Sequence, residues 1–235
     1  MIKNHLESER LKGKLRGYTD SHFNARSFFG FGKREKGSLD KKVARKLNEA
    51  GYLVEQCEYG INDKLTLSII ITYNLDKGTA EIKALTNGEH PAYEMKAIHE
   101  AESATYDIIS HHPKGDVVTK QVYSFDNRGN VIKKTFYNRK GILELIQTFI
   151  HDERNLPVEA QTSYGEGKLY FKYLYTYDEH GNEIESARYS TNRLTEKYTM
   201  EYGDFDKYGN WLKSKTFLNG KLIGLTERQV EYYDE

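Results

Sequence analysis

Residues 173–182 read Tyr-Leu-Tyr-Thr-Tyr-Asp-Glu-His-Gly-Asn, and this stretch decides the fold. Its first half places tyrosine at every second position, a period of two that predicts a β-strand. Its second half predicts a turn, because Asp178 can accept a backbone hydrogen bond from two residues on and Gly181 tolerates positive φ. Residues 184–189 predict the return strand. The unit is therefore a β-hairpin closed by a loop of about four or five residues.

The same turn returns along the second half of the chain. Its aspartates, Asp126, Asp152, Asp178 and Asp206, are 26, 26 and 28 residues apart, and a spacing this regular predicts a repeat architecture. In the second copy, Asn155 stands where the others have glycine, and asparagine is a residue that tolerates left-handed φ. We therefore expect these positions to be structural turn residues: Asp126, Gly129, Asp152, Asn155, Asp178, Gly181, Asp206 and Gly209.

A second kind of turn, such as Asn219-Gly220-Lys221, alternates with the first, so each repeat supplies two strands and two turns. The predicted fold class is mainly β: an antiparallel repeat meander, a twisted or half-barrel sheet of consecutive hairpins. We expect a single β-repeat domain over 1–235, with N-terminal hairpins in 11–85, an irregular or helical insertion in 86–117 and regular repeats in 118–235.

Two segments depart from the hairpin pattern. Residues 91–104 are rich in helix formers and begin with Pro91, which predicts one short helix there. Residues 27–38 are basic, aromatic and rich in glycine, which predicts a long loop.

The charges balance, with 35 Lys and Arg against 35 Asp and Glu. Residues 1–50 carry 13 basic and 6 acidic side chains, but a solvated basic face explains this better than nucleic acid, which is not an expected partner. The single cysteine, Cys57, allows no internal disulfide and is expected to be a packed free thiol. The chain has no run of 18 apolar residues, so no membrane span is predicted, and no secretory signal is visible at the N-terminus.

The search for chemistry yields no catalytic residue, no cofactor site and no metal site. The residues most suited to a metal, His90, Glu94, His99, His111 and His112, lack a metal-binding spacing. Each Asp-x-x-Gly-Asn turn offers too few oxygens for calcium. A ligand could instead stack on an aromatic sheet face, and the candidate contacts are Tyr173, Tyr175, Tyr177, Tyr198 and Tyr202. The competing interpretation is that these rings pack against neighbouring strands.

The repeated aromatic-Asp-x-x-Gly-Asn turn resembles the YD or RHS-type repeats of bacterial cell-surface proteins. The start and the end of the chain also resemble small uncharacterised bacterial envelope proteins and lipoproteins with such repeats. The matching segments are Leu11-Lys12-Gly13-Lys14-Leu15, Gly209-Asn210-Trp211, Asn219-Gly220-Lys221 and the strand from Glu227 to Tyr233. The resemblance implies a β-meander fold and an envelope compartment, with a lipid anchor outside this chain as one variant, but it implies no activity.

These observations together predict a non-enzymatic binding or interaction protein of the bacterial cell envelope. Its expected partner is another protein or a surface glycan, in the periplasm or at the cell surface if a signal peptide has been removed. Two alternatives stay open: a cytoplasmic immunity or antitoxin-type partner protein, and a carbohydrate-binding module.

Overall fold

The structure is a computed structural model of the chain. It describes residues 5–27, 34–74, 76–77, 79–87, 90–100, 105–111 and 117–234. These residues form antiparallel strands joined by hairpins, with one short helix, α1 (His5–Glu9), among them. The predicted mainly β meander is therefore confirmed. The chain divides into two compact units, built chiefly from Ile70–Leu85 with Pro91–Glu196 and from Asn4–Ile69 with Lys197–Glu235.

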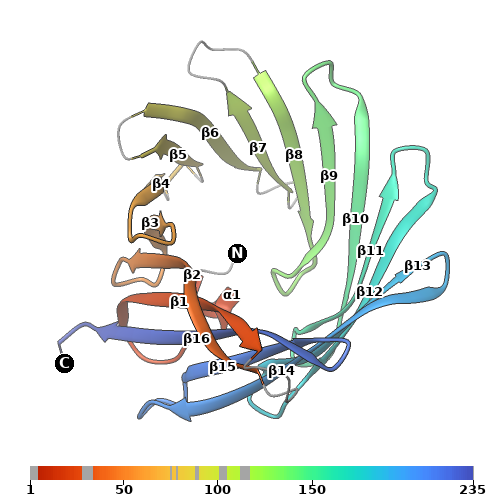
Figure 1. Cartoon of the computed structure of the whole chain (residues 1–235). Coiled ribbons are helices and arrows are strands. Elements are labelled where there is room, and N and C mark those ends of the chain that lie inside the picture. The colour runs from red at the N-terminus through yellow and green to blue at the C-terminus, as the bar shows by residue number, and fades with distance from the viewer. Residues whose placement is uncertain are drawn as a thin grey trace. The chain divides into compact units, whose positions relative to one another are not determined.

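The first unit contains a sheet in which each strand pairs with the next along the chain. Figure 1 shows this succession from β7 in yellow-green to β12 in cyan. All of the pairings from β6 to β13 are antiparallel. The strands are β6 (His90–Glu100), β7 (Thr105–His111), β8 (Val117–Phe125), β9 (Val131–Asn138), β10 (Leu143–His151), β11 (Pro157–Tyr164), β12 (Leu169–Tyr177) and β13 (Glu183–Ser190).

The second unit joins the two ends of the chain in one sheet. The C-terminal strand β16, blue in Figure 1, lies beside the N-terminal strand β1, red, with Asp20 directly opposite Arg228. The strand order in this unit is β14-β15-β16-β1-β2-β3. The bounds are β1 (Leu15–Ser27), β2 (Arg34–Leu47), β3 (Leu53–Tyr59), β14 (Arg193–Phe205), β15 (Trp211–Leu218) and β16 (Lys221–Tyr232), and β14 begins in the first unit.

Two further strands, β4 (Leu65–Asn74) and β5 (Thr79–Thr86), follow β3 in the chain. Their burial alternates along the strand, with Ala80 and Ala84 of β5 buried and Glu81 and Lys83 exposed. This period of two is what a half-buried strand requires.

The two units have different cores. In the second unit Leu15, Tyr18 and Leu47 are at most 3% exposed and form a compact apolar cluster. In the first unit the fully buried positions on the paired strands are small, among them Ala160, Thr162 and Ala187. Small buried residues leave the larger side chains of that sheet half-exposed at its surface.

The helix predicted for residues 91–104 is wrong. Residues His90–Glu100 form strand β6, which pairs with β7 from Glu94 opposite His111 to Glu100 opposite Thr105. Residues 101–104 lie outside the described part. Helix propensity is a weak prior, and a ladder of cross-strand hydrogen bonds overrides it. The alternation of Tyr93, Met95 and Ala97 with charged neighbours carried the strand signal.

The long loop predicted for residues 27–38 is wrong at Ser27 and over residues 34–38, and residues 28–33 lie outside the described part. Strand β1 continues to Ser27 and strand β2 begins at Arg34, with Ala25 opposite Lys36. Gly37 fits this pairing because a Cβ there would lie 2.5 Å from the carbonyl oxygen of Asn24. The glycine therefore allows close strand approach rather than a loop. The single-domain organisation stays a prediction.

Candidate functional site

The repeated aspartates all sit in the same turn geometry. In each copy one carboxylate oxygen accepts hydrogen bonds from the backbone N–H groups two and four residues on, at 2.8 to 2.9 Å. The residue three positions on has positive φ, including Asn155 at 63°. These contacts satisfy backbone donors that the turn would otherwise leave unpaired.

The same hydrogen bonds act on the acidity of the aspartates. Burial opposes ionisation of Asp126, but hydrogen bonds from Asn130 and Arg128 outweigh it, so the pKa of Asp126 is lowered. Asp206 behaves likewise, with Tyr232 and Asn210 as its donors. The turn itself uses most of the acceptor positions of each carboxylate, and the structural role of these residues stays a prediction.

The five predicted ligand-contact tyrosines are divided between the two units. Tyr173, Tyr175 and Tyr177 lie on β12, whereas Tyr198 and Tyr202 lie on β14 in the second unit. Tyr173 and Tyr175 stack with ring centroids 6.2 Å apart. The hydroxyl of Tyr177 donates to the carbonyl oxygen of Pro157 at 2.7 Å, which is a packing role.

The ring of Tyr202 packs on Trp211 at 5.5 Å. That contact lies within the second unit's own strands β14 and β15. The binding role of the five tyrosines stays a prediction.

One face of the first unit carries two transverse rows of side chains in register. Residues directly opposite in antiparallel strands point to the same face, so such rows follow from the strand pairing. The first row is Tyr123, Lys134, Gln147, Thr162 and Phe171. The second is Phe149, Ala160, Tyr173 and Arg188. We call these nine residues the Lys134 face.

The ammonium of Lys134 lies between aromatic rings. Its Nζ is 5.1 Å from the centroid of Tyr123 and 5.3 Å from that of Phe149, and the contact with Phe149 shows that both rows share one face. Among the described residues Lys134 has no ion-pair partner, and burial lowers its pKa. Cation–π contacts contribute about 0.5–2 kcal/mol, but they supply no counter-charge to this half-buried ammonium. Lys134 is therefore a charge without compensation.

Arg188 supplies the second cation of the face. Its guanidinium lies 3.6 Å above the centroid of Phe171 and donates to Glu196 at 2.9 Å. Its Nε is buried without a hydrogen-bond partner. Arg188 thus has a carboxylate that Lys134 lacks.

Between Lys134 and Arg188 the face is mainly apolar, and its polar groups are the Gln147 amide and the Thr162 hydroxyl. Ala160 and Thr162 are buried beneath larger neighbours, so the rings of Phe149, Phe171 and Tyr173 form its surface. Gln147 lies opposite Lys134 and donates from its amide to the Thr162 hydroxyl at 3.3 Å. An anion beside rings and an amide is what this arrangement can hold.

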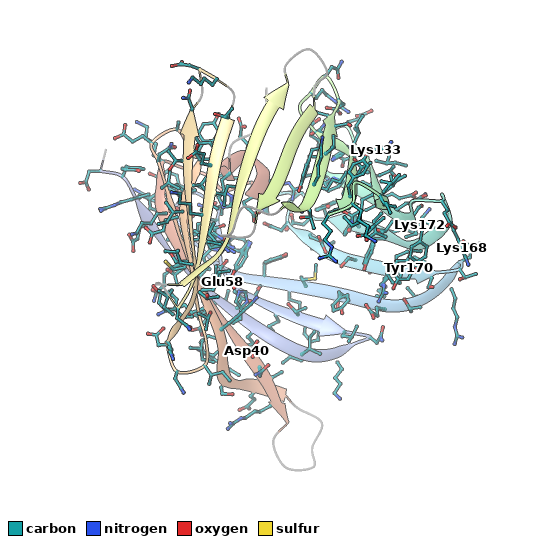
Figure 2. All side chains as sticks on the ribbon, turned by 90° about the horizontal axis from the view of Figure 1, so that it is seen from above. Asp40, Glu58, Lys133, Lys168, Tyr170 and Lys172 are labelled. Carbon is teal, nitrogen blue, oxygen red and sulfur yellow. The ribbon has the colours of Figure 1, made fainter. Side chains whose placement is uncertain are left out.

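The other face of the same strands has ordinary surface chemistry. Lys133 and Lys172, both labelled in Figure 2, belong to a row that runs through Thr148 and Gln161. Lys172 is paired with Glu159 at 2.6 Å, and Lys133 is exposed. Two adjacent lysines, 133 and 134, thus sit in opposite environments.

The second unit holds a charge cluster in which one buried carboxylate pairs with two guanidiniums. Asp20, 5% exposed, receives the guanidinium of Arg228 at 2.7 and 3.0 Å and that of Arg45 at 3.2 Å. The Arg228 guanidinium also lies over the rings of Trp211 at 3.6 Å and Tyr18 at 4.8 Å. Both guanidiniums share the Asp20 carboxylate and pack on aromatic rings, so the cluster reads as structural.

Helix α1 lies against this cluster through His5, whose Nε2 is 2.9 Å from the hydroxyl of Tyr18. Burial lowers the pKa of His5 and raises that of Tyr18. A nearby pocket of about 370 Å³ is lined by Gly13, Lys14, Tyr208, Tyr232 and Tyr233. The Tyr232 hydroxyl is already hydrogen-bonded to Asp206, so the pocket offers few free polar groups.

The remaining candidate chemistry is weak. Burial and the hydrogen bond to Glu55 raise the pKa of the Cys57 thiol, which disfavours the reactive thiolate. No metal-binding group of three or more side chains is found in the described part of the chain. In the register of β6 and β7, His111 is the position opposite Glu94, and His112 lies outside the described residues. Within that same part, no helix has the length and hydropathy of a membrane crossing.

Sequence reasoning found the tyrosines of β12 but missed Lys134, Phe149 and Arg188. These three become neighbours only through the register of β9 to β13, which a single strand does not reveal. One signal was available in the sequence. In β9 the alternate positions 132, 134 and 136 are Ile, Lys and Phe, so Lys134 shares a face of the strand with two apolar residues.

No family model matches this chain, and none of the curated proteins does. Solved structures match over most of its length. A porin-like protein from Bacteroides uniformis is 10% identical, with a TM-score of 0.40, covering 92% of this chain and 96% of the other. A DUF1329 family protein from Desulfovibrio piger is 11% identical, with a TM-score of 0.36, covering 97% and 89%.

A candidate outer membrane lipoprotein-sorting protein domain from Vibrio parahaemolyticus is 11% identical, with a TM-score of 0.33 and coverage of 97% and 92%. These findings correct the resemblance to YD or RHS-type repeat proteins, which is wrong: the structures matched over 92–97% of the chain belong to other groups. Identities this low and TM-scores below 0.5 carry no argument about function. The function is therefore argued from the residues of this chain.

Proposed function

We propose that this protein is a non-enzymatic binding protein of the bacterial cell envelope and that the Lys134 face holds its ligand. One observation carries the proposal: a cation without a counter-charge lies on a half-buried aromatic sheet face. Natural proteins seldom bury an unpaired charge, and when they do the site is a candidate for function.

We assign no catalytic role to this face because its side chains do not form a known catalytic arrangement. Proton transfer needs a titratable pair within hydrogen-bond reach, and nucleophilic catalysis needs a nucleophile beside a base. On this face Lys134 has Gln147 opposite it and aromatic rings beside it. Rings, an amide and a cation hold a ligand without transforming it.

Native mass spectrometry with a water and solvent extract of bacterial envelopes tests this function. We expect a ligand adduct that the Phe149→Ala/Tyr173→Ala variant loses, because these rings form the surface of the face. The matched control is Leu174→Ala, which removes an apolar side chain that is 37% exposed on β12, next to Tyr173 but on the other face of the strand. An adduct that survives in the double variant would overturn the site, and conversion of the bound compound over many turnovers would overturn the non-enzymatic assignment.

A carbohydrate-binding function is a second candidate, favoured by one specific pair of rings. Tyr164 and Tyr170 are 42% and 40% exposed, with centroids 4.9 Å apart. Exposed rings at a hairpin end are suited to stacking on a sugar. Binding on a glycan array that falls in Tyr164→Ala/Tyr170→Ala and persists in Phe149→Ala/Tyr173→Ala would support this second site instead.

A further inference from the structure

We infer that the ligand of the Lys134 face is a single anionic amphiphile: an apolar body bearing one carboxylate or phosphate group that contacts Lys134. This inference rests on the proposed binding function and names the chemistry of its ligand. Three cations on these strands differ in their pairing. Within the described part of the chain, Lys134 is the cation of this face without a carboxylate partner, whereas Arg188 already has Glu196 and Lys172 on the other face has Glu159.

The polar groups near Lys134 are suited to one small anionic headgroup. An ammonium is a compact point charge with three donors, which favours a single carboxylate or phosphate oxygen cluster. The amide of Gln147, directly opposite on β10, lies within the same row as a second donor. On β8 the neighbour is Tyr123, whose hydroxyl already donates to Gln121 at 3.0 Å. The headgroup position is thus at Lys134 and Gln147.

The apolar body follows from the direction of the second row. From Lys134 the aromatic surface continues over Phe149, then over buried Ala160, to Tyr173. Adjacent strands are about 4.8 Å apart, so Phe149 on β10 and Tyr173 on β12 span about 10 Å of the face. An alkyl chain laid along this row buries its carbons against rings, and each buried methylene contributes about 0.8 kcal/mol by the hydrophobic effect.

The second cation does not call for a second headgroup. Lys134 lies on β9 and Arg188 on β13, four strand spacings or about 19 Å apart, too far for one carboxylate or phosphate to bridge. Because Glu196 neutralises Arg188, the far end of the row favours an uncharged tail. The ligand therefore carries its charge at one end.

Isothermal titration calorimetry of the full chain with monomeric laurate and dodecyl phosphate tests the inference, with dodecyl maltoside and acetate as single-feature probes. We expect laurate, dodecyl phosphate or both to bind, and the neutral detergent and the bare headgroup to bind at least tenfold more weakly. Binding of only one charged probe identifies which headgroup is recognised. Equal affinity for dodecyl maltoside, or no binding of either anionic amphiphile, would overturn the inference.

Two adjacent lysines provide the matched variants. Lys134→Met removes the charge and keeps the length of the side chain, and we expect about a tenfold loss of affinity for the anionic amphiphile, the size of one hydrogen bond to a charged group. Lys133→Met removes a charge from the opposite, exposed side of the same strand and should leave the affinity unchanged. Equal losses in both variants would mean that net charge alone attracts the ligand, which overturns the Lys134 contact.

The inference and the proposed function fail separately. If a neutral ligand binds and Phe149→Ala/Tyr173→Ala abolishes that binding, the face is a binding site and only the anionic chemistry is wrong. If the anionic amphiphile binds equally well to this double variant, the face itself is wrong. Anionic vesicles that bind the chain while monomeric laurate does not would also overturn the inference, because the site would then recognise a membrane surface.

Discussion

The two units use the same pair of components, a cation over aromatic rings, in opposite ways. In the second unit Arg228 lies over Trp211 and Tyr18 and is hydrogen-bonded to Asp20. In the first unit Lys134 lies near Tyr123 and Phe149, and no carboxylate of the described residues pairs with it. Aromatic rings around a cation therefore do not by themselves mark a binding site. The presence or absence of a counter-charge separates a structural cluster from a candidate ligand contact.

The largest expected effect comes from breaking the paired cluster. Asp20→Ala leaves Arg45 and Arg228 buried without a counter-charge, so we expect the free energy of unfolding to fall by about 3–5 kcal/mol in urea denaturation. The exposed Asp40 on β2, labelled in Figure 2, is the control, and Asp40→Ala should change stability by less than about 0.5 kcal/mol. A loss below about 1 kcal/mol for Asp20→Ala would show that the cluster is not structural.

The repeated turn allows a comparison at matched positions. Asp178→Ala in the first unit removes hydrogen bonds to two backbone groups and to the Asn182 amide, and should cost about 2 kcal/mol. Asp206→Ala in the second unit also removes the bond from Tyr232, so it should cost about 1 kcal/mol more. Equal losses in chemical denaturation would mean that Tyr232 contributes nothing to the second unit.

Removing the charge of Lys134 should change stability in the opposite direction to removing Asp20. Lys134→Met removes a desolvated charge and keeps the contacts of the alkyl chain, so we expect an unchanged or higher thermal midpoint, with a gain of about 1 kcal/mol. Arg228→Met, the matching change in the second unit, should lower the midpoint because Asp20 loses one of its two partners. A clear loss of stability in Lys134→Met would assign Lys134 to the scaffold.

The smallest effect is a dependence on pH. Burial lowers the pKa of Lys134 in the folded chain, so the charge costs stability below that pKa. The cost disappears as pH rises from the lowered folded value to the ordinary lysine value of about 10.4. The gap in unfolding free energy between wild type and Lys134→Met should therefore narrow with rising pH.

The groups that face Lys134 decide how cleanly this effect is measured. Gln147 and Phe149 from β10 are uncharged, and Tyr123 from β8 has a pKa raised by burial. A Tyr123→Phe background removes the one neighbouring titration. In that background, a gap that stays constant up to pH 11 would contradict a lowered pKa at Lys134.

The sequence predicts the meander well because each hairpin is local. The alternating tyrosines of β12 and the Asp178 turn lie within ten residues, so a short window contains all of their determinants. The register that brings Lys134, Phe149 and Arg188 to one face spans five strands, which no local pattern encodes. Strand β6 was mispredicted as a helix for a related reason. Pairing with β7, and not the helix propensity of residues 91–104, decides the conformation of this segment.

The pairing of β16 with β1 has a consequence for the order in which the chain folds during its synthesis. Asp20 and Arg228 are 208 residues apart, so the second unit cannot complete its sheet or its charge cluster until β16 has left the ribosome. The hairpins of the first unit need only neighbouring residues and can form as they emerge. Until then β1 presents an unpaired edge, with Arg45 as the partner already available to Asp20. The first unit can thus form early, whereas the second unit closes last. Truncation near residue 228 should therefore prevent folding far more than a nick in any of the hairpin turns would.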